Sequence, residues 1–354
     1  MKLTLERRLA PSKAASWTGM IVAIVLAFCM GGVVFLFAGA DPFDAYAVMA
    51  QGAFGSLYNL SEVVVKAIPL MLCGLAVAIP SRILIWNIGA EGQLVLGGIG
   101  SAGIALFVSS HLPGLFVLPL MLGAGFLAGG LWALLAGLLR ARLEVNEILT
   151  SLMLNYVAIF WLEHLYFGPW RDPMGMGFPG TAMFPEAAAL PRLPGTRIHL
   201  GILLAVIAAA GLCLALRGTR WGYEVRVIGE NPKAARYAGM DVARHILWAM
   251  FLSGGLAGMA GMAEAAGIHY RLQQGLAVGH GYTGIIVAWL ARLHPAGVVI
   301  VALFIGSLLV GGDQLQTVMK LPSAVGLVLE GTLLFFVLGS DFFARYRISW
   351  RRER

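Results

Sequence analysis

Apolar runs long enough to cross a membrane dominate this sequence. The hydrocarbon core of a bilayer is roughly 30 Å thick and requires about 20 apolar residues in a helix. About ten runs approach that size, at residues 17–40, 63–79, 83–109, 115–139, 148–167, 199–216, 246–266, 282–291, 296–311 and 324–339. We therefore expect an all-α, polytopic integral membrane protein of about ten transmembrane helices, forming a single transmembrane domain over residues 1–354.

Composition supports a membrane protein over a soluble one. Charged residues make up 12% of the chain and the apolar set 59%, whereas soluble domains carry about 25% charged residues. A soluble protein of this composition would have too few polar residues to cover its surface. The three cysteines, Cys29, Cys73 and Cys213, each lie in an apolar run, so we expect packing residues and no disulfide scaffold. The first run exceeds the roughly 7 to 15 apolar residues of a signal peptide and is expected to remain as a span.

The distribution of basic residues predicts the orientation in the membrane. The net charge is +7, but the basic residues are scattered between apolar runs, so no nucleic-acid partner is expected. With ten spans and the N-terminus inside, nineteen of the 25 lysines and arginines fall on inner segments. The outer segments hold the other six: Lys66, Arg171, Arg192, Arg197, Arg271 and Lys320. The positive-inside rule therefore predicts that both termini are cytoplasmic.

Two connections are longer than the rest. The outer one, residues 168–197, contains six prolines, which forbid a long helix or a central strand. The inner one, residues 217–245, contains a capped helix signal: Asn231 is a good N-cap, Pro232 suits the first helical position and Gly239 suits the C-terminal stop. We expect a cytoplasmic helix of about two turns here. It either docks a partner or packs on the protein's own helices.

Polar residues inside the apolar runs are candidates for a transport path. Asn87, Glu91 and Gln93 interrupt the third run, and a carboxylate at membrane depth normally faces a bundle interior or a water-filled path. Asn155 and Glu264 are further candidates in their spans. The alternative is that Glu91 lies near the inner interface and pairs with Arg82 or with a neighbouring loop, and that single polar groups only tie helices together.

The sequence contains glycine patterns that suggest helix packing and lacks the common ATPase and metal-binding motifs. Two strings fit the dinucleotide fingerprint G-x-G-x-x-G, at residues 98–103 and 279–284, but neither has the strand and acidic residue that this site needs, so we expect close helix packing instead. Paired glycines four residues apart, such as Gly125 with Gly129 and Gly254 with Gly258, suggest the same. There is no P-loop and no Cys or His cluster with metal spacing. We expect no ATPase, protease or metal site, and no enzyme activity, in this chain.

Four segments together resemble a known family. They are WNIGAEGQLVLGG in the third run, NEILTSLMLNYVA after the fourth, GENPKAARYAGMDV in the inner loop and GYTGIIVAWLARLHP near the eighth. In this order they resemble the permease subunits of bacterial ABC importers, in the branch for nucleosides and simple sugars, which is related to ribose and branched-chain amino acid permeases. The resemblance covers residues 63–342.

The resemblance implies a passive pore subunit in the bacterial cytoplasmic membrane with no cofactor of its own. It implies three protein partners: a cytoplasmic ATPase that binds ATP, a second, paralogous permease chain in a heterodimer or homodimer, and an extracytoplasmic substrate-binding protein. The ATPase would receive the short inner helix, at Gly229, Glu230, Asn231, Pro232, Ala234, Ala235, Arg236, Tyr237 and Gly239. The E-A-A-x-x-x-G signature of another importer class is only partly present, because Lys233 stands where glutamate would.

Two classes of function remain open from the sequence. The first is an ABC permease that passes nucleosides, with ribose or another simple sugar as the alternative solute. The second is a secondary transporter in which Glu91 or Glu264 carries a proton or pairs with a cation. The capped inner helix favours the first, since a gradient-driven carrier has no need of an ATPase dock.

Overall fold

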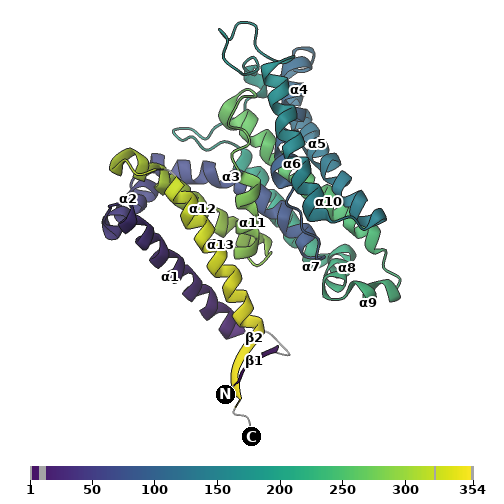
Figure 1. The fold of residues 1–354 in the computed structure, drawn as a ribbon. Coiled ribbons are helices and arrows are strands. Elements are labelled where there is room, and N and C mark those ends of the chain that lie inside the picture. Colours follow the sequence, from purple (N-terminus) through teal and green to yellow (C-terminus); the bar gives the residue numbers. More distant parts are fainter. Residues whose placement is uncertain (1, 8–12, 323, 352–354) are drawn as a thin grey trace. The chain divides into compact units, whose positions relative to one another are not determined.

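The computed structural model describes residues 2–7, 13–322 and 324–351 (Figure 1). It is helical apart from one antiparallel pair of terminal strands, β1 (Lys2–Arg7) and β2 (Tyr346–Arg351). The predicted all-α class is confirmed, with this short pair as an addition that no pattern indicated. The chain divides into two compact units, Ser61–Gly306 on one hand and Met1–Leu60 with Ser307–Arg354 on the other.

Eight helices in the described part of the chain are long and apolar enough to cross a membrane. They are α1 (Lys13–Phe37), α3 (Leu57–Ser81), α4 (Ala90–Phe107), α5 (Gly114–Leu143), α6 (Glu147–Phe167), α7 (Gly201–Gly218), α10 (Val242–Glu264) and α12 (Pro295–Met319). The tenth predicted run forms α13 (Ala324–Arg345), whose described apolar part is shorter. The eighth forms α11 (His280–Leu290), which at 11 residues spans about 16 Å and cannot cross alone. The polytopic architecture is thus confirmed.

The unit that holds both termini contains α1, α2 (Pro42–Phe54) and α13. The sequence patterns did not predict α2; it begins at an aspartate cap, where Asp41 Oδ1 accepts hydrogen bonds from the backbone N–H groups of Phe43 and Asp44 at 2.8 and 3.2 Å. Helix α1 packs along α13, and β1 pairs with β2 at one end of this helix pair (Figure 1). The two terminal strands therefore lie at the same end of α1 and α13.

Glycines hold the centre of the other unit together. Helices α4, α5 and α10 pack side by side (Figure 1), and a Cβ at Gly129 or Gly258 would overlap the carbonyl oxygen of Gly254 or Gly125 across the α5–α10 contact. A Cβ at Gly261 would overlap the backbone of α4 at Leu94. The sequence prediction of close helix packing at the paired glycines is confirmed.

The ends of three helices meet at the end that loop charges predict to be cytoplasmic. The Arg82 guanidinium, just after α3, donates two hydrogen bonds to the carbonyl oxygen of Leu293, at 2.6 and 3.2 Å. Leu293 lies in the turn between α11 and α12, beside His294, which contacts Arg217 at the end of α7 at 2.9 Å. Burial and the nearby Arg217 lower the pKa of His294.

The opposite end carries the proline-rich connection. No long helix forms in it, as predicted; its one helical turn is η2 (Glu186–Ala188) in the residues described. Its backbone is tied to the segment that follows α10, where Thr181 N donates to Leu272 O at 2.9 Å and Phe184 N donates to Tyr270 O at 2.7 Å. The connection is therefore an ordered cap over this end of the helix bundle.

Candidate functional site

The candidate site centres on a break between α3 and α4. Residues 82–89 leave the helical path after Ser81, and Leu84 takes a left-handed conformation at φ 61°. The break lies deep in the bundle, because Asn87 bonds to Ser253, the twelfth of the 23 residues of α10. That position is about 16 Å along the helix from Val242 at 1.5 Å per residue. Irregular backbone at membrane depth must be buried in protein or line a water-filled cavity.

Asn87, Gln93 and Ser253 form one buried network around the break. The Asn87 amide donates to Gln93 Oε1 and to Ser253 Oγ, both at 2.8 Å, and its Oδ1 accepts from the Gln93 amide at 2.9 Å. Ser253 Oγ donates to Ala76 O on α3 at 2.6 Å. Each of the three side chains is at most 1% exposed. The network therefore joins α3, α4 and α10 through polar groups that are all paired.

Glu91 supplies the N-terminal cap of α11. Its carboxylate oxygens accept the backbone N–H groups of Gly279 and Gly281, at 2.8 and 2.6 Å. A Cβ at Gly281 would overlap the backbone of Glu91, so the glycine is what permits this approach. A carboxylate at a helix N-terminus satisfies free N–H donors and is stabilised by the helix dipole. Of the alternative prediction, the pair between Glu91 and Arg82 is wrong, because Arg82 bonds to Leu293 instead, whereas the bond from Gly279 agrees with its other form, a contact with a neighbouring loop.

Asn155 fastens α6 to the same break. Its amide donates to Ile88 O at 2.9 Å and to the Tyr282 hydroxyl at 3.1 Å, and its Oδ1 accepts from Gly92 N at 2.8 Å. The side chain is fully buried. Four of the five predicted path residues, Asn87, Glu91, Gln93 and Asn155, thus come together around residues 82–93.

Glu264 does not join this group. It lies at the end of α10, 3.8 Å from His269 in η3 (Ala265–His269), a single π-helical turn. His269 in turn contacts the Gln273 amide at 3.2 Å, and Gln273 Oε1 accepts from Arg271 at 2.6 Å. Glu264 therefore belongs to a separate polar chain toward the outer end. The sequence analysis did not pair Glu264 with His269, because no recognised motif contains both residues.

Glu147 is a second residue that the sequence analysis missed. It is 7% exposed, accepts a hydrogen bond from Trp86 N at 3.3 Å and forms an ion pair with Arg140 Nε at 3.3 Å. It follows Asn146, whose side chain caps α6 through Ile148 N at 2.9 Å. The asparagine followed by an acidic residue before an apolar run was the available signal.

The inner loop forms two helices. The predicted capped helix is α9 (Pro232–Tyr237), where Asn231 Oδ1 accepts from Lys233 N and Ala234 N at 3.0 and 3.1 Å, and Gly239 has a φ of 80°. It is preceded by α8 (Arg220–Glu230), which no sequence pattern had indicated. Helix α8 packs against the chain directly after α3, since a Cβ at Gly229 would overlap the carbonyl oxygen of Arg82.

Only part of α9 is available to a partner. Ala235 is fully buried within the chain, whereas Tyr237 is 95% exposed and Ala234 is also exposed. Ala234, Tyr237 and Ala238 therefore lie on the exposed side of α9. Ala235 and Gly229, proposed as docking positions from sequence, pack inside the subunit.

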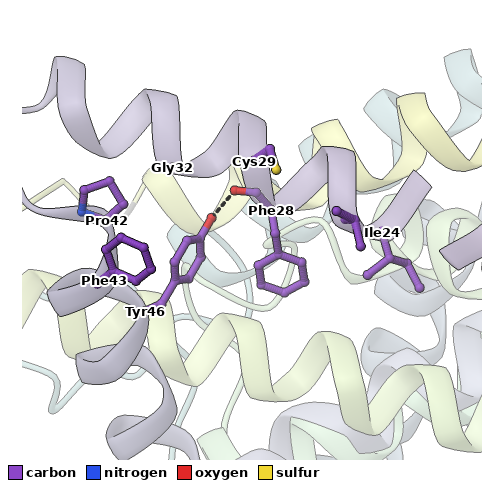
Figure 2. Close-up of a pocket in the computed structure, with 8 residues that line it drawn as sticks. Ile24, Phe28, Cys29, Gly32, Pro42, Phe43 and Tyr46 are labelled. Atoms are coloured by element: carbon purple, nitrogen blue, oxygen red, sulfur yellow. Dashed lines mark hydrogen bonds between the residues drawn. The ribbon is translucent and has the colours of Figure 1, made fainter. Parts of the chain in front are cut away.

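Two pockets on the described surface are large enough to hold a small molecule. The first, of about 430 Å³, lies between α1 and α2 and has an apolar lining (Figure 2). The Tyr46 hydroxyl donates to the carbonyl oxygen of Phe28 at 2.5 Å. The lining residues are Ile24, Val25, Phe28, Cys29, Gly32, Pro42, Phe43 and Tyr46. It does not suit a hydrophilic solute. Another, of about 470 Å³, lies between α8 and α10 beside Glu224, whose pKa is lowered by a hydrogen bond from Arg220.

One buried histidine lies at the outer end. His199 is fully buried, its Nδ1 accepts from Gly201 N at 3.2 Å, and its Nε2 has no hydrogen-bond partner in the described part of the chain. Burial lowers its pKa to about 4, so the ring is neutral near pH 7. The residues described contain no group of three or more His, Cys, Asp or Glu side chains placed to hold a metal ion.

A broken span and a capped half-helix at membrane depth are features that many membrane transporters share. The chain belongs to the family described as the permease component of branched-chain amino acid transport systems, whose family model matches residues 59–338. The family is a membrane component and not the ATPase. The protein is thus the permease component of an ABC transporter and one part of a larger transport system.

Three relatives cover nearly the whole chain. The glucose ABC transporter permease protein TsgB13 of Haloferax volcanii is 38% identical over 98% of this chain and 93% of its own length. The guanosine ABC transporter permease protein NupP of Bacillus subtilis is 32% identical over 90% of this chain and 92% of its own length. The nucleoside ABC transporter permease protein NupB of Lactococcus lactis is 27% identical over 90% of this chain and 89% of its own length.

Proposed function

We propose that this permease passes nucleosides into the cell across the bacterial cytoplasmic membrane. The observation that carries the proposal is the 32% identity to NupP over 90% of the chain, with NupB as a second nucleoside permease of similar coverage. A simple sugar, glucose or ribose, is the second candidate, and the 38% identity to TsgB13 favours it. Both solute classes are neutral rings that carry hydroxyl groups, so they make similar demands on a path.

The predicted path residues take part in this proposal in two ways. Asn87, Gln93 and Asn155 hold the broken segment in place, and Glu91 holds the α11 half-helix at membrane depth. They shape the path, because their polar atoms are already paired within the subunit. Glu264, beside His269, is the candidate that offers a polar group of its own near the outer end.

Coupling to a cytoplasmic ATPase is proposed to occur through α9. A capped helix of six residues would be marginal alone in water, but here Ala235 anchors it and leaves the Tyr237 side exposed. An exposed tyrosine is a common anchor residue at protein interfaces. ATP would be bound and hydrolysed by that partner, since this chain has no P-loop and no enzyme activity is proposed for it.

Two further partners complete the proposed importer. A second, paralogous permease chain would cover the exposed apolar side chains of Leu84 and Trp86 in the broken segment. A heterodimer is proposed, with a homodimer as the alternative. An extracytoplasmic binding protein would deliver the solute to the capped outer end.

Uptake by the complete system tests the substrate. Cells that express this permease with its ATPase, companion permease and binding protein should accumulate radiolabelled guanosine, and guanosine should raise the melting temperature of the binding protein. Uptake of glucose or ribose without any nucleoside would replace the first candidate with the second. Full uptake by this chain alone, in liposomes with a proton gradient and without ATP, would instead support a secondary transporter.

A further inference from the structure

His245 joins α10 to the inner loop that holds α8 and α9. It is the fourth residue of α10, and its side chain is 9% exposed. Its ring Nδ1 lies 2.8 Å from the carbonyl oxygen of Asp241, and its Nε2 lies 2.8 Å from a carboxylate oxygen of Glu224 on α8. A carbonyl and an ionised carboxylate can only accept hydrogen bonds. Both contacts together therefore require a hydrogen on each ring nitrogen, which makes His245 a cation paired with Glu224.

Glu224 is held by two donors. Its Oε2 contacts His245, and its Oε1 accepts a hydrogen bond from Arg220 Nε, one turn earlier on α8, at 2.8 Å. The hydrogen bond from Arg220 is the largest cause of the lowered pKa of Glu224, and His245 lowers this pKa further. The Arg220 side chain is 90% exposed, so water screens its contribution. The contact with His245 is therefore the better shielded of the two.

The ion pair bridges an open space between two helices. Glu224 and His245 both line the pocket of about 470 Å³ between α8 and α10. Where a pocket separates two helices, few packed side chains can pass a displacement from one helix to the other. A charge-assisted hydrogen bond fixes both the distance and the direction between its partners. The polar bridge therefore carries a large part of the connection between α8 and α10 at this point.

Each end of the bridge is built into a larger group of helices. Helix α8 leads directly into α9, because Asn231 ends the first helix and caps the second. Helix α8 also touches the end of α7, since a Cβ at Gly222 would overlap the carbonyl oxygens of Ala215 and Leu216. At the other end, α10 packs with α4 and α5 through the glycine contacts described above. The bridge thus joins the inner loop to the three central helices.

We propose that the ion pair of Glu224 and His245 transmits movement of α8 and α9 to α10, and that His245 is a positioning residue for transport. A force on α9 displaces α8 because the two helices share Asn231, and the ion pair passes the displacement to α10. Helices α4 and α5 follow, since their backbones interlock with that of α10. This inference rests on the proposed ATPase contact at α9 and names the contact through which that movement reaches the broken span.

Uptake per ATP hydrolysed, measured in liposomes that contain the complete transporter, tests the proposal. His245→Leu and Glu224→Leu should each lower this ratio roughly fivefold while ATPase binding stays normal, since contacts between coupled sites change coupling by about two- to thirtyfold. The double variant should lose no more than either single variant, because both substitutions remove the same contact. His245→Gln keeps a donor of similar reach and should give a ratio between those of wild type and His245→Leu.

A control and a melting curve separate coupling from a purely structural role. Arg226→Gln removes an exposed charge of α8 outside the ion pair and should match wild type. Loss of a structural anchor alone would lower the melting temperature of the permease and reduce ATP hydrolysis and uptake in the same proportion, so that their ratio stays constant. A wild-type ratio in both leucine variants would overturn the proposal, and so would additive losses in the double variant.

Failure of the proposed ATPase contact gives a different result. If Tyr237→Ala leaves ATPase binding unchanged, the contact at the Tyr237 side of α9 is wrong, while a lowered ratio in the leucine variants still supports the ion pair as the link to α10. If Tyr237→Ala abolishes binding and the leucine variants keep the wild-type ratio, the ATPase contact stands and the ion-pair proposal is overturned. The ratio is measured with guanosine or with glucose, whichever the wild-type transporter carries, so the identity of the solute does not affect the outcome.

Discussion

The carboxylate of Glu91 holds the start of α11 through the backbone of Gly281, at 2.6 Å, with a second bond from Gly279 at 2.8 Å. A helix of 11 residues that begins inside a membrane leaves N–H donors that no water can satisfy. Glu91, on the first turn of α4, satisfies two of them and places a negative charge at the positive end of the helix dipole. Glu91, whose carboxylate is costly to bury in a membrane, therefore serves as the N-terminal cap of the short helix α11.

Removing this cap should destabilise the transporter. Glu91→Leu leaves two buried N–H groups unpaired, at about 1–3 kcal/mol each, and should strongly lower both uptake and the melting temperature of the purified complex. Glu91→Gln keeps one acceptor and should have a moderate effect on both. Glu163→Gln, which alters a carboxylate on α6 outside this network, is the control and should match wild type. A Glu91→Leu variant with wild-type stability would contradict the capping role.

The two faces of α9 should respond differently to substitution. Tyr237→Ala alters the exposed side and should reduce ATPase co-purification and transport while the permease inserts and melts normally. Ala235→Arg forces a charged side chain into a fully buried position and should lower the melting temperature of the permease itself. Purification in mild detergent with ATPase quantification measures both. Normal ATPase binding by Tyr237→Ala would show that the Tyr237 side of α9 does not contact the ATPase.

The orientation in the membrane can be tested by cysteine labelling. In a background that lacks the three native cysteines, Gly218→Cys adds a thiol at an open position at the end of α7, and Met174→Cys adds one at an exposed position in the proline-rich connection. An impermeant reagent applied to intact cells should label only the second. Labelling of the cysteine at position 218 from outside would show that the predicted orientation is wrong.

His199 should make the outer end sensitive to acid. Its folded pKa of about 4 lies below the unfolded value of 6.5, so between these values the unfolded chain binds more protons than the folded one. The stabilisation is complete above about pH 6.5 and is lost as the pH falls toward 4, by on the order of 3 kcal/mol. The melting temperature should therefore fall over this range in wild type.

A variant pair isolates the histidine. His199→Asn removes the titrating ring and keeps an acceptor near Gly201 N, so its melting temperature should depend less on pH between 4 and 6.5. His111→Asn changes an exposed histidine and should behave like wild type. Parallel pH profiles for wild type and His199→Asn would show that other groups dominate the acid response.

The features that the sequence predicted correctly are those that depend on local chemistry. The spans follow from run length, α9 from its Asn231 cap and Gly239 stop, and the close α5–α10 contact from paired glycines. These signals are contained within short windows of the chain. Helix α8 was missed because its apolar residues alternate with charges along a short stretch, although Gly222, Val225 and Ile228, three residues apart, form its buried face.

The roles of the polar residues could not be predicted from sequence. Glu91 bonds to residues 188 and 190 positions away, and Asn87 to a residue 166 positions away. Which partner such a group finds depends on tertiary packing, so the pattern indicated a buried polar site and could not separate a path lining from a cap. The stacked pair of Trp86 and Trp289 was missed for the same reason, since the two residues lie about 200 positions apart in the chain.

The glycine contacts among α4, α5 and α10 restrict how this permease can open and close. Their backbones touch at Gly97, Gly129, Gly254 and Gly258, and interdigitated backbones cannot slide past one another without collision. Any alternation between outward and inward access must therefore move these three helices together as one rigid body. The bending must fall where the chain is irregular, in residues 82–89 and in the left-handed turn of Arg292 and Leu293 before α12.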